Sequence, residues 1–175
     1  MKKEQPEIDN KRLNAAGFRF AVVVSRWNSS FTDKLREGAI DALLECGATE
    51  EAIEVFKVPG AFELPLACLK AAETGRFDAV VALSVIIRGD TPHFEYVAGE
   101  AARGIMDVGM TTGIPVLFGV ITADTVEQAT ERCGERLNNK GYEAAMAAIQ
   151  VANLYREMAN EQGVKGNEKR LSHVV

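Results

Sequence analysis

Four short apolar runs, each followed by a segment with helical spacing, constrain this chain more than any other feature of its sequence. The runs lie at residues 18–24, 52–58, 78–87 and 114–122. Strands that alternate with helices in this way form right-handed crossovers, which place the strands parallel and put helices on both faces of the sheet. The sequence therefore predicts an α/β fold in which a four-stranded parallel sheet lies between two layers of helices.

The boundaries of the helices can be predicted from glycine, proline and threonine residues. Gly47 and Gly75 are placed as C-terminal stops, and Pro65 is tolerated only in the first turn of a helix. Thr91 is expected to cap a third helix, with Pro92 at its first position. Helices are thus predicted over residues 29–46, 63–74, 92–112, 125–137 and 141–160, the last two separated by "NNKG".

Composition limits the class of protein. The chain has 175 residues, of which 47% are hydrophobic, enough for one compact domain. A formal charge of −5 argues against a nucleic acid or an anionic membrane as partner. No apolar run approaches the roughly 18 residues needed to cross a bilayer. Because Cys46, Cys68 and Cys133 are scattered, we expect neither disulfides nor a metal cluster, and a cytoplasmic location.

The ends of the chain are more polar than its middle. We expect an N-terminal arm over residues 1–12, one domain over residues 13–160 and a polar tail over residues 161–175. The chain after Glu161 is predicted to be unstructured.

Unusual residues gather where predicted strands lead into helices. In parallel sheets, ligands bind beyond the carboxyl ends of the strands. These junctions read "SRWN", "VPGAFELP", "IIRGDTPH" and "FGVITAD", whereas the opposite connections are ordinary polar turns. They hold Trp27, the only tryptophan; His93, the only histidine before the tail; and Arg88, for which the sequence offers no evident partner. We therefore expect a site at this edge of the sheet.

Two of the junctions have both a binding and a structural interpretation. The indole of Trp27 could stack on a flat ring or cover the helix below it. The turn before Glu63 could pair its backbone with a heterocycle while the carboxylate accepts bonds from hydroxyls. Alternatively, Glu63 is an ordinary carboxylate at a helix N-terminus.

The junction "RGDTPHF" is the strongest candidate for a binding site. Gly89 permits close approach of the backbone, and the amides that open the next helix favour an anion. His93 lies beside them and could transfer protons near neutral pH, although a lone histidine is also often structural. The sequence contains neither GxGxxG nor a Walker pattern, so a nucleotide phosphate is not expected. Arg132 and Lys140 are either solvated or a cationic pair over a phosphate.

Six ordered blocks between residues 13 and 158 resemble the lumazine synthase family of riboflavin biosynthesis. The blocks are "SRWN", "EGAIDAL", "VPGAFELP", "IRGDTPHFEYVA", "PVLFGVITADTVEQATER" and "NNKGYEAA". The resemblance implies a flavodoxin-like three-layer fold and a transferase that needs no metal or organic cofactor. The implied reaction condenses 5-amino-6-(D-ribitylamino)uracil with 3,4-dihydroxy-2-butanone 4-phosphate to give 6,7-dimethyl-8-ribityllumazine, phosphate and water.

The resemblance also implies roles for individual residues. His93 falls on the proton donor, Arg132 on the guanidinium partner of the phosphate and Lys140 on a wall contributed by the adjacent subunit. The implied pyrimidine and ribityl site comprises Trp27, Ala61, Phe62, Glu63, Val85, Ile86, Ile87 and Phe118, and the implied butanone phosphate site comprises Asp90, Thr91 and Arg132.

Two positions depart from the family pattern. Trp27 stands where phenylalanine is common, which enlarges the stacking face and favours retention of flavins. Asp90 stands where a small or neutral residue is frequent, and we expect its carboxylate to point away from the phosphate. A flavin-binding paralogue without turnover and a structural shell protein are therefore alternative interpretations.

The resemblance further implies an assembly. Subunits are expected to form pentamers in which Phe118, Arg132 and Lys140 of one chain complete the site of its neighbour. The short turn at residues 133–143 and the segment 8–17, which could add a strand to a neighbour's sheet, favour a 60-subunit shell over a free pentamer. Association with riboflavin synthase is a further possible partnership.

Overall fold

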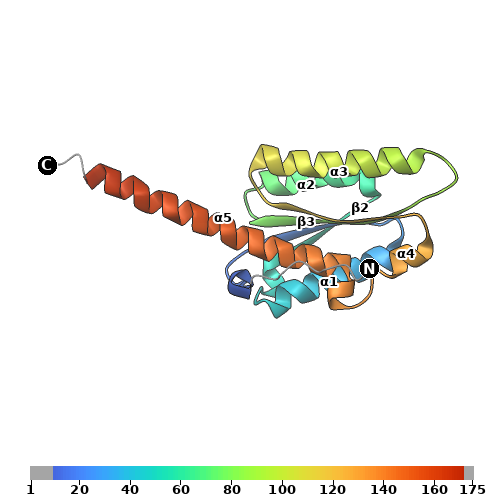
Figure 1. The fold of residues 1–175 in the computed structure, drawn as a ribbon, viewed down its shortest axis with the longest axis horizontal. Coiled ribbons are helices and arrows are strands. Elements are labelled where there is room, and N and C mark those ends of the chain that lie inside the picture. The colour runs from blue at the N-terminus through green and yellow to red at the C-terminus, as the bar shows by residue number, and fades with distance from the viewer. Residues whose placement is uncertain (1–9, 172–175) are drawn as a thin grey trace, which may run out of the picture.

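A four-stranded parallel sheet lies between two layers of helices (Figure 1). The computed structural model describes the backbone of residues 10–171 and the side chains of residues 11–160. The strand order is β2-β1-β3-β4, and every neighbouring pair is parallel, as predicted. The strands are β1 (Phe20–Ser25), β2 (Ile53–Val58), β3 (Ala79–Ile87) and β4 (Val116–Ala123).

Each face of the sheet carries its own apolar core. Alternate residues of a strand point to opposite faces, so Val22 and Leu83 pack towards α1 (Ser29–Glu45) and α5 (Lys140–Leu171). Val23 and Ala82 pack towards α2 (Leu64–Glu73) and α3 (His93–Thr112). This gives the flavodoxin-like α/β sandwich expected from the sequence. The helices are α1 (Ser29–Glu45), α2 (Leu64–Glu73), α3 (His93–Thr112), α4 (Val126–Thr130) and α5 (Lys140–Leu171), with short 3-10 helices at Asn10–Arg12, Glu50–Ala52, Ala61–Glu63 and Arg136–Asn138.

Most of the predicted helix boundaries are confirmed. Gly47 and Gly75 follow α1 and α2 with φ of 97° and 65°, the left-handed conformation that favours glycine at a helix end. Pro65 lies in the first turn of α2. The cap predicted for α3 is wrong by one residue, because Pro92 rather than Thr91 occupies the cap position and α3 begins at His93.

The two C-terminal helices differ from the prediction. The helix expected over residues 125–137 ends at Thr130, because Cys133 pairs with Asn139 in an antiparallel bridge and Arg136 has a φ of 47°. By contrast, α5 continues to Leu171 and extends away from the sheet (Figure 1), so an unstructured chain after Glu161 is the wrong prediction for residues 161–171. That segment is polar but has no proline, and its Glu, Gln, Lys and Arg residues are good helix formers. Residues 1–9 of the predicted arm and 172–175 of the tail lie outside the described residues.

The start of α5 is fixed against α1 by one buried amide. Asn139 is 3% exposed, and its Oδ1 accepts the backbone N–H groups of Gly141 (2.9 Å) and Tyr142 (3.2 Å). Its Nδ2 donates to the carbonyls of Lys34 (2.9 Å) and Gly134 (3.0 Å). A Cβ at Gly141 would lie 1.9 Å from the carbonyl oxygen of Leu35. The two helices therefore approach each other more closely here than any other residue would allow.

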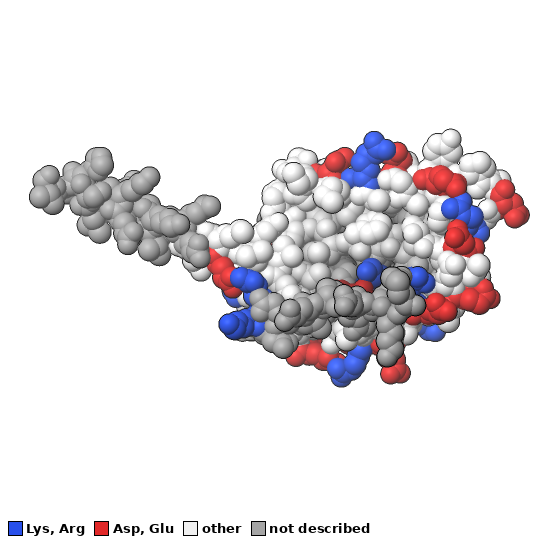
Figure 2. Space-filling model, viewed as in Figure 1, with Lys and Arg blue, Asp and Glu red and all other residues white. Residues whose placement is uncertain are grey.

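Apolar side chains remain exposed on one face of the chain. Tyr96, Met106 and Met110 share one side of α3 by helical spacing, and Phe118 is 40% exposed on the edge strand β4. Figure 2 shows a broad uncharged area between α3 and α5, with charged side chains around its rim. Contiguous exposed apolar surface of this kind is typical of an interaction site.

Candidate active site

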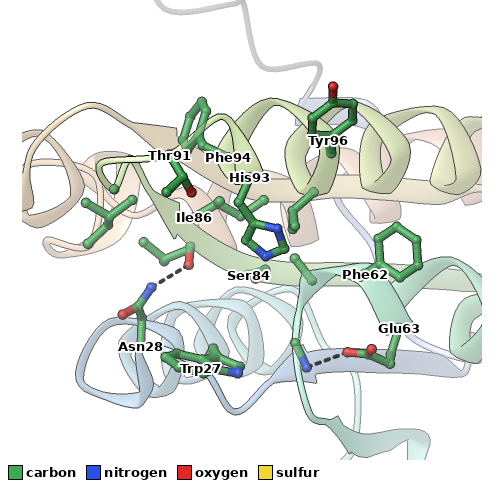
Figure 3. Close-up of a pocket in the computed structure, with 16 residues that line it drawn as sticks. Trp27, Asn28, Phe62, Glu63, Ser84, Ile86, Thr91, His93, Phe94 and Tyr96 are labelled. Atoms are coloured by element: carbon green, nitrogen blue, oxygen red, sulfur yellow. Dashed lines mark hydrogen bonds between the residues drawn. The ribbon is translucent and has the colours of Figure 1, made fainter.

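A pocket of about 650 Å³ opens at the carboxyl ends of β1, β2 and β3, where the sequence predicted a site (Figure 3). The junctions after these strands converge on it. Its lining includes nine of the predicted site residues: Trp27, Ala61, Phe62, Glu63, Val85, Ile86, Ile87, Thr91 and His93.

The junction after β1 forms one wall of the pocket. The N–H groups of Arg26 and Trp27 donate to the carbonyls of Val58 (2.8 Å) and Pro59 (3.1 Å), which ties this loop to the end of β2. The Trp27 indole is 73% exposed and lies along the floor of the pocket in Figure 3. At this exposure much of the indole surface is available to a planar ring.

Asn28 is a pocket residue that the sequence analysis missed. It has a left-handed backbone conformation (φ 58°), and its Nδ2 donates to the carbonyl of Val85 at 2.8 Å. The amide therefore holds the Trp27 loop against the end of β3. The available signal was the asparagine itself after "SRW", since asparagine adopts the left-handed region more readily than most residues.

The junction after β2 presents a carboxylate that is held by its own turn. The N–H of Gly60 donates to Oε2 of Glu63 at 2.8 Å, at the start of the 3-10 helix Ala61–Glu63. This bond fixes the side chain at the pocket rim while Oε1 makes no hydrogen bond among the described residues. Glu63 is thus a carboxylate at a helix end, one of the two interpretations considered from the sequence, and its side chain also lines the pocket.

His93 is the first residue of α3, and its ring points into the pocket from the wall opposite Trp27 (Figure 3). The imidazole is exposed rather than packed in the core, so its position does not favour a purely structural role. Gly89 and Thr91 line the pocket beside it, whereas Asp90 is not among the lining residues. Phe94, Tyr96 and Val97 also line the pocket and were not among the predicted site residues.

Arg88 is paired, contrary to the expectation from sequence. Its Nε donates to Oδ1 of Asp124 at 2.7 Å, and its Nη1 donates to Oε1 of Glu95. Asp124 follows β4, and Glu95 lies in the first turn of α3. Asp124 comes near Arg88 only when the sheet has folded. These bonds raise the pKa of Arg88 and lower the pKa of Glu95, so both groups are charged at neutral pH.

Besides Asp90, three predicted site residues lie outside this pocket. Phe118 is on β4, Arg132 follows α4 and Lys140 begins α5. Nη1 of Arg132 donates to the carbonyl of Gln128 at 2.7 Å, and Nζ of Lys140 donates to Oε2 of Glu143 at 2.8 Å. The backbone N–H of Lys140 donates to the carbonyl of Arg132 at 2.9 Å, which holds the backbones of the two residues together.

The described residues offer neither a cluster of metal ligands nor a membrane-spanning helix. No group of three or more His, Cys, Asp or Glu side chains is placed to hold a metal ion in that part of the chain. None of the helices there is both long and apolar enough to span a bilayer.

Comparison with known sequences assigns the chain to a family. The sequence model of the 6,7-dimethyl-8-ribityllumazine synthase family matches residues 17–156. This chain is a member of that family. A protein of Desulfatibacillum aliphaticivorans with the name 6,7-dimethyl-8-ribityllumazine synthase is 50% identical over 149 residues, which cover 85% of this chain and 96% of the relative. The resemblance found in the six sequence blocks is thereby confirmed. The match to the lumazine synthase family includes both the pocket and the four predicted residues outside it.

Proposed function

We propose that this chain catalyses the condensation of 5-amino-6-(D-ribitylamino)uracil with 3,4-dihydroxy-2-butanone 4-phosphate, the penultimate step of riboflavin biosynthesis. The observation that carries the proposal is the pocket, in which an exposed indole and an exposed imidazole face each other inside the region matched by the family. In this reaction an amine attacks a ketone and loses water to give an imine, phosphate is eliminated, and ring closure with loss of a second water forms the lumazine.

Each wall of the pocket fits one part of that chemistry. The indole of Trp27 offers a stacking face for the pyrimidine, and the strand end at residues 85–87 offers backbone groups to the ring edge. Oε1 of Glu63 is placed to accept bonds from ribityl hydroxyls. His93 exchanges protons with the reacting nitrogen and oxygen atoms, and the amides at Thr91 favour the phosphate. Most of the rate enhancement then comes from holding two reactants in orientation.

Mixing both substrates with the protein tests the reaction directly. Lumazine absorbance and phosphate release should both rise well above a protein-free control, which is essential because the condensation also proceeds without a catalyst. Rates equal to the control would exclude the proposed activity.

The proposed site is completed by a second copy of the chain. Phe118, Arg132 and Lys140 lie on β4, after α4 and on α5, and the pocket's described lining includes none of them. A head-to-tail contact, which forms a ring when the rotation between copies closes, would bring these residues to the pocket of a neighbouring copy. The exposed apolar face of α3 and β4 supports an interface between copies. We propose a pentamer, as the family resemblance implies.

Light scattering on the purified protein should give a mass near 60 chains. The expectation rests on the short turn between α4 and α5, and a mass near five chains would replace the shell with a free pentamer. A monomer with full activity would exclude the shared site as well.

Replacing Arg132 with alanine should weaken capture of the butanone phosphate by roughly 1.5–3 kcal/mol, because a charge-assisted contact to phosphate is lost. Binding of the pyrimidine alone should barely change in calorimetry. Trp27→Ala should show the reverse pattern and serves as the matched control. Equal loss of both substrates in Arg132→Ala would contradict the role proposed for the guanidinium.

A flavin-binding protein without turnover is a second candidate, and the exposed indole of Trp27 favours it. Flavin that co-purifies with the protein, combined with a condensation rate equal to the control, would select this candidate.

The proposal also includes a cytoplasmic location, which the three free cysteines support, and association with riboflavin synthase.

A further inference from the structure

The first turn of α3 carries His93 but is not closed by a capping side chain. Pro92 occupies the cap position without a side-chain hydrogen bond, and residues 88–92 form no regular structure. The N–H of Glu95 donates to the carbonyl of Pro92 at 3.1 Å. A helix start of this kind needs another contact to fix its direction.

Arg88 supplies such contacts from the end of β3. Its guanidinium bonds to Glu95 in the first turn of α3 and to Asp124 after β4, and it lies 4.1 Å from the centroid of the Phe94 ring. Its backbone N–H donates to the carbonyl of Ala123 at 2.9 Å. One side chain therefore joins the ends of two strands to the two residues that follow His93.

We propose that Arg88 is a positioning residue for the reaction, which holds the first turn of α3 so that the His93 imidazole points into the pocket. The inference rests on the proposed function of His93, and it assigns Arg88 no contact with substrate. The Nε and Nη1 atoms of Arg88 already donate to carboxylates, and the ring of Phe94 covers one face of the guanidinium. The side chain is thus arranged to hold protein groups rather than to receive a phosphate.

Arg76 provides a matched control at the opposite end of the sheet. Its guanidinium bonds to Glu54 at 2.6 Å and lies 4.8 Å from the centroid of the Phe77 ring. The two arginines have similar exposure, 49% for Arg76 and 40% for Arg88. Arg76→Ala therefore removes an ion pair and a cation–π contact of the same kind without touching the pocket.

The experiment compares Arg88→Ala, Arg88→Lys, Glu95→Gln and Arg76→Ala with the wild type. Arg88→Ala should lower kcat about tenfold and leave KM for the pyrimidine within about twofold, because displacement of a reacting group affects turnover more than binding. Arg88→Lys should recover part of kcat, and Glu95→Gln should lower it in the same direction. Arg76→Ala should change kcat less than about twofold, and the Tm of each variant should stay within roughly 4 °C because exposed ion pairs add little stability.

Hydrogen exchange gives a readout that does not depend on activity. Backbone amides of residues 88–97 should exchange faster in Arg88→Ala than in wild type and Arg76→Ala. Unchanged exchange there, or a kcat equal to that of Arg76→Ala, would overturn the inference. A raised KM for the butanone phosphate with unchanged kcat would also overturn it, since Arg88 would then bind that substrate directly. Failure of the proposed function is distinct, because wild type would then show no rate above the protein-free control.

Discussion

His93→Ala should slow turnover by about 10- to 1000-fold, the usual contribution of a side chain that transfers protons in the transition state. Trp27, Glu63 and the end of β3 still line the pocket in this variant, so the reactants remain oriented and activity should not vanish. Steady-state assays with both substrates measure the effect, and KM for the pyrimidine should change little.

Added imidazole should restore part of the lost rate, because the variant leaves space where the ring pointed into the pocket. The same addition should not accelerate wild type. An unchanged rate in a folded His93→Ala protein would contradict the assignment of His93 as the proton-transfer group.

Gly141→Ala should lower the stability of the fold by at least about 3 kcal/mol, which corresponds to a fall in Tm of roughly 6–12 °C for a domain of this size. The new Cβ would lie 1.9 Å from the carbonyl oxygen of Leu35, and backbone atoms cannot yield as a flexible side chain can. The two helices must then separate, which strains the hydrogen bonds of Asn139. Thermal unfolding followed by circular dichroism measures the change.

Gly109→Ala on α3 is the matched control. A Cβ at this helical glycine would lie 3.6 Å from the nearest atom, the carbonyl oxygen of Ile114, which is ordinary contact. Alanine favours a helix over glycine by about 1 kcal/mol, so Tm should stay level or rise by up to roughly 4 °C. Equal Tm values for the two variants would show that α1 and α5 can separate without cost.

The sheet and the five helix starts, each to within one residue, could be predicted because their signals are local. Runs such as residues 78–87 are apolar on both faces, which is typical of a buried parallel strand. Gly47 and Gly75 each follow a helical pattern, where glycine favours the left-handed conformation that ends a helix. The location of the pocket followed from the same pattern, since parallel strands bring their carboxyl ends to one edge. Fold class and site location thus depended on residues close together in sequence.

Partners distant in the chain could not be predicted. Arg88 looked unpaired because Asp124 comes 36 residues later and meets it only once β3 and β4 pair. Asn28 had no visible role because its acceptor, the Val85 carbonyl, belongs to another strand. For Phe118, Arg132 and Lys140 the site itself is proposed to lie on another copy, so neither one sequence nor one chain can show their contacts.

The errors in the C-terminal helices have a different cause. Residues 125–137 have helical composition, but the buried amide of Asn139 and the bridge to Cys133 stabilise a turn instead. Polarity after Glu161 resembled disorder, although the same residues are good helix formers. For residues 125–137, intrinsic propensity favours a helix whereas the tertiary contacts favour a turn, and the contacts determine the structure.

The position of Trp27 has a spectroscopic consequence. It is the only tryptophan of the chain, and its indole is already 73% exposed in the folded subunit. Its emission in a single chain should therefore lie near that of a hydrated indole and change little when the chain unfolds. A blue shift or quenching would instead report that a ring or a neighbouring subunit has covered the pocket. The protein thus carries an intrinsic fluorophore that reads occupancy and assembly rather than folding.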